Sequence, residues 1–168
     1  NHKDVDKKID FRNEDIFRFF KFNKNKFDLI MIKQTLHLIT KDKRKKLIKI
    51  CKKRLKINGV LIIFSLNIEN NEIPCFKLMK LKLDWGLKRD SNMLKSVCKI
   101  LKNHKIDKFI FNVSITKKKY IKMLKRKYIS CLINMTNKQI NKGVKEIEDY
   151  FPKKIFFEDI MICIKYKN

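Results

Sequence analysis

Two short apolar runs on either side of an amphipathic segment most constrain how this chain can fold. Residues 27–32 and residues 60–66 have the length and composition of buried strands. Residues 41–56 carry one apolar stripe among lysines, which predicts a helix that ends at Asn58 and Gly59. A strand, a helix and a strand in this order predict adjacent parallel strands joined by a right-handed crossover.

The segments that follow continue this alternation. Residues 73–88 fit both a strand period and a helical period, and we favour a helix. Asp90 or Ser91 can cap a further helix, and residues 109–115 predict a strand. Thr116 can cap the helix after that strand. The pattern is that of an α/β domain.

The last part of the chain adds one helix and one strand. Thr136 followed by Gln139 forms a capping-box pattern ahead of a helical apolar stripe. Residues 155–166 predict a final strand that an acidic pair interrupts. We find no internal repeat and no linker, so residues 1–168 predict a single domain.

The chain is strongly basic, with 43 lysines and arginines, 17 acidic residues and a net charge of +26. Such a charge is typical of proteins that bind nucleic-acid phosphates. Lysine, however, is spread along every polar segment, alanine is absent, and isoleucine and asparagine are abundant, which is the composition that an A+T-rich genome imposes. A basic nucleic-acid-binding module therefore stays open as an alternative, but we do not favour it.

Cysteine and histidine spacings bear on metals and on the cellular compartment. The five cysteines lie at wide, irregular intervals without a CxxC pair, and the three histidines never occur at ligand spacing. We expect no metal site and a reducing, cytoplasmic compartment. No uncharged apolar run approaches the roughly 18 residues of a membrane span, so we expect no membrane association. The sequence leaves the oligomeric state open.

Four stretches resemble, in order and spacing, the second half of a class I S-adenosylmethionine-dependent methyltransferase core. They are Asn13-Glu14-Asp15-Ile16, Phe27-Asp28-Leu29-Ile30, Gln34-Thr35-Leu36-His37-Leu38 and Leu55-Lys56-Ile57-Asn58-Gly59-Val60-Leu61-Ile62. The resemblance implies a Rossmann-like, doubly wound α/β fold with a mostly parallel sheet and an antiparallel last strand. It also implies that the first strand-helix units of that fold are missing from this chain.

The remainder of the chain, from Ser114-Ile115-Thr116 to Phe157-Glu158-Asp159, is similar to a small-molecule branch of the same family, which includes trans-aconitate methyltransferase-like proteins. The resemblance implies an enzyme that transfers a methyl group from S-adenosylmethionine to an oxygen, nitrogen or carbon atom of a small molecule. An RNA methyltransferase and a non-catalytic domain of the same fold stay open as alternatives.

The resemblance also implies a set of cofactor-binding residues. Asp15 would accept a hydrogen bond from the adenine amine, and Ile16 would pack on the adenine ring. Lys33 and Gln34 follow the strand at 27–32, where ligands dock in open α/β sheets. Asp15 and Ile16 have structural alternatives, because Asp15 can cap a helix and Ile16 can belong to the core.

Four further residues are candidates on the substrate side. His37 could orient the substrate or act as a general base, or be a structural histidine at the start of a helix. Trp85 and Tyr128 could line a pocket for an organic molecule, although aromatic residues more often pack in the core. Arg126 could hold a substrate carboxylate, although it lies in a lysine-rich segment where charges are usually solvated.

The chain departs from the family pattern where the cofactor is held. No GxGxG motif precedes Asp15, the acidic residue for the ribose hydroxyls is missing, and the three glycines (Gly59, Gly86, Gly143) are isolated. A glycine-rich turn is what lets the backbone approach such a ligand. We therefore expect an N-terminally truncated chain, inactive by itself, that binds S-adenosylmethionine poorly until extended upstream.

Overall fold

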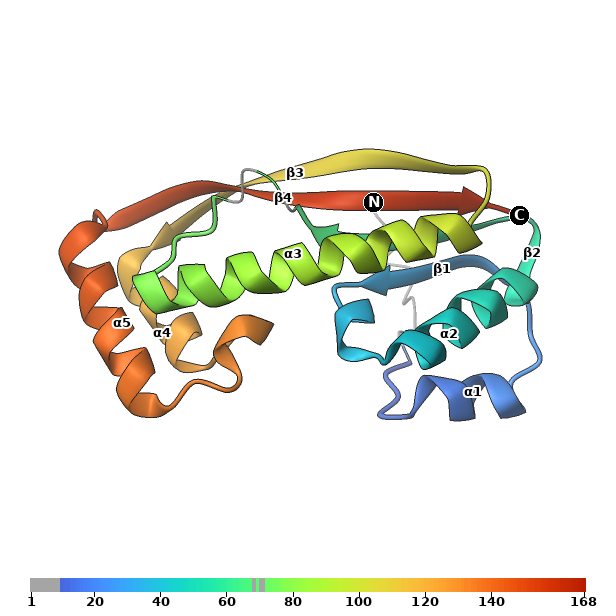
Figure 1. Cartoon of the computed structure of the whole chain (residues 1–168), viewed down its shortest axis with the longest axis horizontal. Coiled ribbons are helices and arrows are strands. Elements are labelled where there is room, and N and C mark those ends of the chain that lie inside the picture. Colours follow the sequence, from blue (N-terminus) through green and yellow to red (C-terminus); the bar gives the residue numbers. More distant parts are fainter. Residues whose placement is uncertain (1–9, 68, 70–71) are drawn as a thin grey trace, which may run out of the picture.

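The computed structural model describes residues 10–67, 69 and 72–168. In these residues four strands form one sheet in the order β1-β2-β4-β3 (Figure 1). Five α-helices and two short 3-10 helices complete the described part of the chain. The strands are β1 (Phe27–Lys33), β2 (Leu55–Leu66), β3 (His104–Thr116) and β4 (Lys154–Lys167).

The sheet has the directions that the sequence predicts. β1 and β2 are adjacent and parallel, with Leu29 opposite Val60 and Lys33 opposite Phe64. The helix α2 (Lys41–Arg54) joins them. β4 is antiparallel to both β2 and β3, so β1, β2 and β3 all run in one direction. The Rossmann-like α/β class, with an antiparallel last strand, is confirmed.

The helix α2 ends two residues before the predicted boundary. Leu55 is fully buried and extended (φ −75°, ψ 143°), and it begins β2 instead of continuing the helix. Asn58 adopts the left-handed conformation (φ 62°) that the Asn58-Gly59 pair suggests. Gly59 is needed for space, because a Cβ there would lie 2.8 Å from the carbonyl oxygen of Phe27 on β1.

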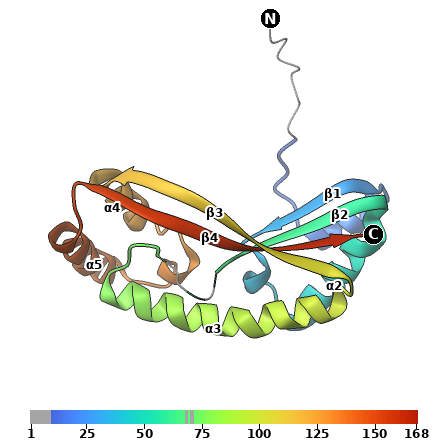
Figure 2. The same cartoon turned by 90° about the horizontal axis from the view of Figure 1, so that it is seen from above.

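The prediction of two helices between residues 73 and 101 is wrong, because one helix, α3 (Lys77–Ile100), spans this region. Its buried residues recur at helical spacing without a break (Met79, Leu83, Leu87, Met93, Leu94, Val97). Asp90 lies within this run with a side chain only 13% exposed, and it caps nothing. The long helix runs along the length of β3 and β4 (Figures 1 and 2).

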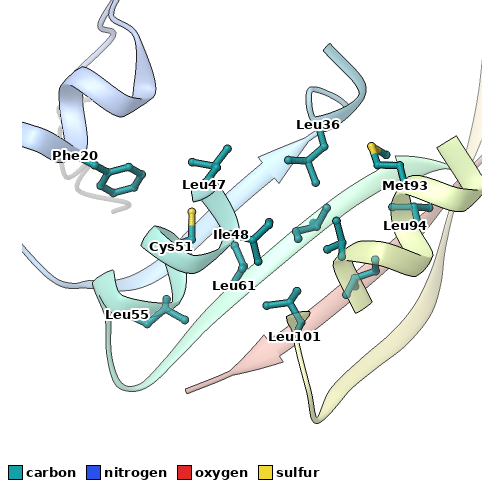
Figure 3. Packing of buried hydrophobic residues seen from close by; sticks show 13 residues of the cluster. Phe20, Leu36, Leu47, Ile48, Cys51, Leu55, Leu61, Met93, Leu94 and Leu101 are labelled. Atoms are coloured by element: carbon teal, nitrogen blue, oxygen red, sulfur yellow. The ribbon is translucent and has the colours of Figure 1, made fainter. Parts of the chain in front are cut away.

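Buried apolar side chains form two clusters, one near each end of α3. The β1–β2 core packs α2 and the carboxyl half of α3 against the sheet around Ile48, Leu61 and Leu94 (Figure 3). The α4–α5 core packs α4 (Lys117–Lys125) and α5 (Asn137–Tyr150) against the start of α3. Tyr120 and Ile147 lie at its centre.

Two helix starts follow the sequence closely. Thr116 Oγ1 accepts a hydrogen bond from the backbone N–H of Lys119, 3.3 Å away. The capping box of Thr136 and Gln139 is formed in full at the start of α5. The predicted interruption of the last strand is wrong, because β4 continues through Asp159, which pairs with Phe111 of β3.

The remaining elements are α1 (Ile16–Phe22) and the 3-10 helices η1 (Leu36–Leu38) and η2 (Ser130–Leu132). Across the part of the chain that the structure describes, no helix is both long and apolar enough to cross a membrane.

Candidate functional site

A cavity of about 680 Å³ opens beyond the carboxyl ends of β1 and β2. Gln34 follows β1, Ser65 ends the buried part of β2, and both line this cavity. The middle of α3 forms a second wall, the loop at 127–134 a third, and Asp159 of β4 completes it. Open α/β sheets bind their ligands at this position, so the cavity is the candidate site.

Unusual backbone conformations point to the same cavity. Four non-glycine residues in the described part of the chain have a positive φ, and two of them are asparagines, which tolerate it. The other two, Gln34 (φ 51°) and Lys127 (φ 53°), both line the cavity. Such backbone strain is concentrated at functional sites in proteins generally.

Hydrogen bonds hold both strained residues in place. The backbone N–H of Gln34 donates to the carbonyl of Phe64 at 2.9 Å. Its side-chain amide donates to Met161 Sδ at 3.5 Å. The ammonium of Lys127 donates to the carbonyls of Ile133, at 3.1 Å, and Met135, at 2.6 Å. Lys127 therefore shapes the loop that closes the cavity.

His37 lies in η1 and lines the cavity. Its Nε2 atom is buried and has no hydrogen-bond partner among the described residues. Burial lowers the pKa of His37; Asp90 opposes this shift, whereas Arg89 and Arg44 add to it. The ring is therefore neutral near pH 7 and can accept or donate a hydrogen bond, depending on its tautomer.

Asp159 is a cavity residue that the sequence did not single out as functional. Its Oδ1 atom is buried and, like His37 Nε2, has no partner in the described part of the chain. Burial raises the pKa of Asp159, and the positive charge of Lys33 opposes that shift. The available signal was the acidic pair inside the apolar strand, which we took as an interruption.

A pair of tyrosine hydroxyls links the cavity wall to the α4–α5 core. The hydroxyl of Tyr120 donates to the carbonyl of Pro74 and lies 3.2 Å from the hydroxyl of Tyr128. Burial raises the pKa of Tyr128 to about 12, so it stays protonated at neutral pH. Tyr128 lines the cavity, and its substrate-side role stays a prediction, whereas Tyr120 is part of the α4–α5 core.

Trp85 and Arg126 differ in their placement. Trp85 lines the cavity and is 69% exposed, so it is not a core residue. The guanidinium of Arg89 lies 5.7 Å from its ring centroid and also pairs with Asp90 at 3.1 Å. Arg126 is exposed at the end of α4 and does not line the cavity.

Three of the residues that the family resemblance assigns to the cofactor lie outside the cavity. Asp15 caps α1, and its Oδ1 accepts hydrogen bonds from the backbone N–H groups of Phe17 and Arg18, at 2.9 and 3.0 Å. Ile16 begins α1 and is 38% exposed. Neither of these residues lines the cavity, nor does Lys33. Their cofactor roles stay predictions.

The described residues do not by themselves form a cradle for S-adenosylmethionine. The glycines lie in β2, α3 and α5, and none is in a turn between a strand and a helix. Asp15 already uses one carboxylate oxygen as a helix cap. A search of the described residues also finds no cluster of three or more histidine, cysteine or acidic side chains that could hold a metal.

A second hollow, of about 740 Å³, lies between α1 and α2. Its lining combines three phenylalanines with five cations (Phe17, Phe20, Phe22, Arg18, Lys21, Lys46, Lys53, Arg54). Arg54 is partly committed, because it donates to the carbonyls of Phe20 and Lys24 at 3.2 and 2.8 Å.

Comparison with known proteins finds a sequence similarity in the first part of the chain. A sequence model of the methyltransferase domain matches residues 1–63, which end within β2. A solved Bacillus halodurans protein, provisionally named a methyltransferase, is similar at 13% identity and a TM-score of 0.46. That match covers 87% of this chain and 66% of the other. The curated proteins give no match. Residues 1–63 are thus similar to a methyltransferase domain.

Proposed function

We propose that this chain supplies the substrate-binding part of an S-adenosylmethionine-dependent methyltransferase that acts on a small molecule. The observation that carries the proposal is the cavity of about 680 Å³ with two buried polar atoms that have no hydrogen-bond partner among residues 10–67, 69 and 72–168. Its volume lies within the range of about 300 to 1,000 Å³ typical of small-molecule sites. The match of residues 1–63 to a methyltransferase domain supports the reaction class.

The chain's own residues would mainly bind and align the acceptor. Alignment is the chief requirement for a displacement at an activated methyl group. Trp85 and Leu83 give the cavity apolar walls, and neutral His37 offers a nitrogen that can receive a proton. Arg126 would take part only if the α4 end moves toward the ligand, because it lies outside the cavity.

We assign the cofactor side to Asp15, Ile16, Lys33 and Gln34, as the family resemblance implies. When bound, S-adenosylmethionine would supply the activated methyl group. The glycine-rich loop and the ribose carboxylate would have to come from a segment outside these 168 residues, since the sequence holds neither.

The test uses the complete gene product and S-adenosylmethionine labelled in its methyl group. The labelled donor is incubated with a small-molecule extract or with RNA, and each fraction is counted. We expect label in the small-molecule fraction, reduced by about 100-fold or more in His37→Asn. His104→Asn is the matched control, because His104 lies outside the cavity and bonds the carbonyl of Leu101. Label in RNA alone, or in neither fraction, refutes the proposal.

An RNA methyltransferase is the second candidate, and the hollow between α1 and α2 favours it. Phenylalanine rings beside cations are a combination that binds single-stranded nucleic acid. If RNA is the substrate, retention on immobilised RNA falls steeply with salt and falls further in Lys46→Gln. The non-catalytic alternative predicts that even the complete gene product binds no S-adenosylmethionine in calorimetry.

A further inference from the structure

Tyr128 lines the cavity, and its hydroxyl can serve a ligand only as an acceptor. A tyrosine hydroxyl has one proton, and Tyr120 donates its proton to the carbonyl of Pro74. The hydrogen bond between the two hydroxyls, 3.2 Å apart, must then use the proton of Tyr128. Only the lone pairs of Tyr128 remain for a ligand.

Asp159 adds a second acceptor near the first. Its Oδ1 is buried and unpartnered within the described residues, and its charge contributes to the raised pKa of Tyr128. The side-chain amide of Gln34, which also lines the cavity, is directed at Met161 Sδ. Both acceptors line the same cavity.

Three lysine or arginine side chains line the cavity, and two of them, Lys127 and Arg89, are committed elsewhere, whereas Lys82 is the third. The ammonium of Lys127 donates to the carbonyls of Ile133 and Met135. The guanidinium of Arg89 pairs with Asp90. A buried acceptor without a donor is costly, so a bound molecule with N–H groups would relieve the cost at Asp159.

We propose that Asp159 and Tyr128 form a recognition subsite for a nitrogen group that carries several N–H donors, such as an amine or amidine of the substrate. The proposal rests on the proposed function, because it names the substrate class of that cavity. Asp159 accepts one N–H through Oδ1, and Tyr128 accepts another through its phenolic oxygen. A molecule that offers only acceptors at this end leaves both atoms unpaired.

The test titrates the 168-residue chain with benzamidine and with benzoate, which have the same shape but opposite hydrogen-bonding groups. Binding is followed by NMR at the backbone amides of Gln34, Tyr128 and Asp159. We expect benzamidine to bind with a Kd of about 1 mM, as for a fragment of this size, and benzoate about tenfold or more weakly. Perturbed amides should surround the cavity and spare α1.

Three variants make the assignment specific. Asp159→Asn should weaken benzamidine binding about tenfold or more, and Tyr128→Phe about threefold or more. Asp107→Asn changes a charge on the exposed neighbouring strand and should have no effect. Because Asp159→Asn removes a buried, unpaired charge, its Tm should rise by a few degrees, which shows that a loss of binding is not a loss of fold.

Equal binding of benzamidine to the wild type and to Asp159→Asn, or no binding at about 10 mM, overturns the subsite. The same holds if benzoate binds as well as benzamidine. This failure is distinct from that of the proposed function, which is decided by transfer of labelled methyl groups. Methyl transfer to a molecule without N–H donors would support the proposed function and contradict the subsite at Asp159 and Tyr128.

Discussion

The two ends of the molecule differ in what they contribute. The β1–β2 end contains α1, β1, α2 and most of β2, and residues 1–63 of this end match a methyltransferase domain. The α4–α5 end lies outside that match, yet it supplies the loop at 127–134 to the cavity. Of the described residues up to position 63, only Gln34, His37 and Leu38 line the cavity, and none of the three belongs to α1 or α2.

The part of the chain that matches a methyltransferase domain is therefore not the part that supplies most of the cavity wall. The parallel β1-α2-β2 unit is a regular arrangement that many sequences can form, and its pattern is recognisable from local periodicity. The walls that would select a ligand come from residues far apart along the chain. A family match confined to the first end therefore says little about the substrate.

The largest expected effect tests whether the two ends unfold together. Ile48 and Ile147 are fully buried, one in each core, so Ile48→Ala and Ile147→Ala should each lower the free energy of unfolding by about 2 to 5 kcal/mol. Because α3 packs in both cores, we expect one urea transition in each variant. Ile57→Ala, at an 87% exposed position, is the control. Two separate transitions would show that the ends are independent units.

The next effect sharpens the role of the α4–α5 end. A Cβ at Gly143 would lie 2.4 Å from the buried ring of Phe76, so Gly143→Ala should destabilise the protein by about 1 to 3 kcal/mol. A Cβ at Gly86 in α3 meets nothing within 4 Å, so Gly86→Ala should stabilise the fold by about 0.5 to 1 kcal/mol. Thermal unfolding compares the two, and equal shifts would contradict the packing of Phe76 on α5.

A smaller effect concerns the tyrosine pair between the α4–α5 core and the cavity. Tyr120→Phe leaves the carbonyl of Pro74 without its donor and should cost about 1 to 2 kcal/mol. Tyr150→Phe, at a 78% exposed position, should change nothing. Urea unfolding measures both. If Tyr120→Phe is neutral, the hydroxyl chain to Tyr128 is not a stabilising contact.

The smallest effect is the pH dependence from His37. Burial lowers its pKa in the folded state, so the unfolded chain binds the proton more tightly. Stability should therefore fall as the pH drops below the unfolded value of about 6.5 and continue to fall until the folded pKa is passed. His37→Gln should show a smaller decrease in Tm between pH 7.5 and pH 5.5 than the wild type. An unchanged decrease would assign the acid sensitivity to other groups.

Local sequence patterns predicted most of the fold. The strands β1 and β2, the crossover helix and the caps at Thr116 and Thr136 all depend on neighbours a few residues away. The division of α3 failed because Asp90 resembles a helix cap, whereas in the fold it faces the cavity from the middle of the helix. A polar residue inside an apolar stripe is ambiguous until its surroundings are known.

The candidate site was predictable only in part. Gln34 and His37 follow a strand end, and Trp85 and Tyr128 are aromatic, so general rules of position and chemistry found them. Asp159 is recognised as a site residue only from the fold, because β4 lies between β2 and β3 and carries Asp159 to the cavity. Long-range packing of this kind decides which buried polar atoms lack a hydrogen-bond partner. Residue spacing along the chain does not predict it.

The continuous helix α3 also limits how a ligand can enter and leave. The wall from Lys82 to Asp90 is the middle of a 24-residue helix whose two halves are anchored in different cores. Opening this wall would require breaking helical hydrogen bonds or separating both cores. The loop at 127–134, which forms another wall of the cavity, contains the one-turn helix η2 and is otherwise irregular. We expect exchange of molecules with solvent to depend on that loop, so its motion would set the rate at which a ligand enters and leaves the cavity.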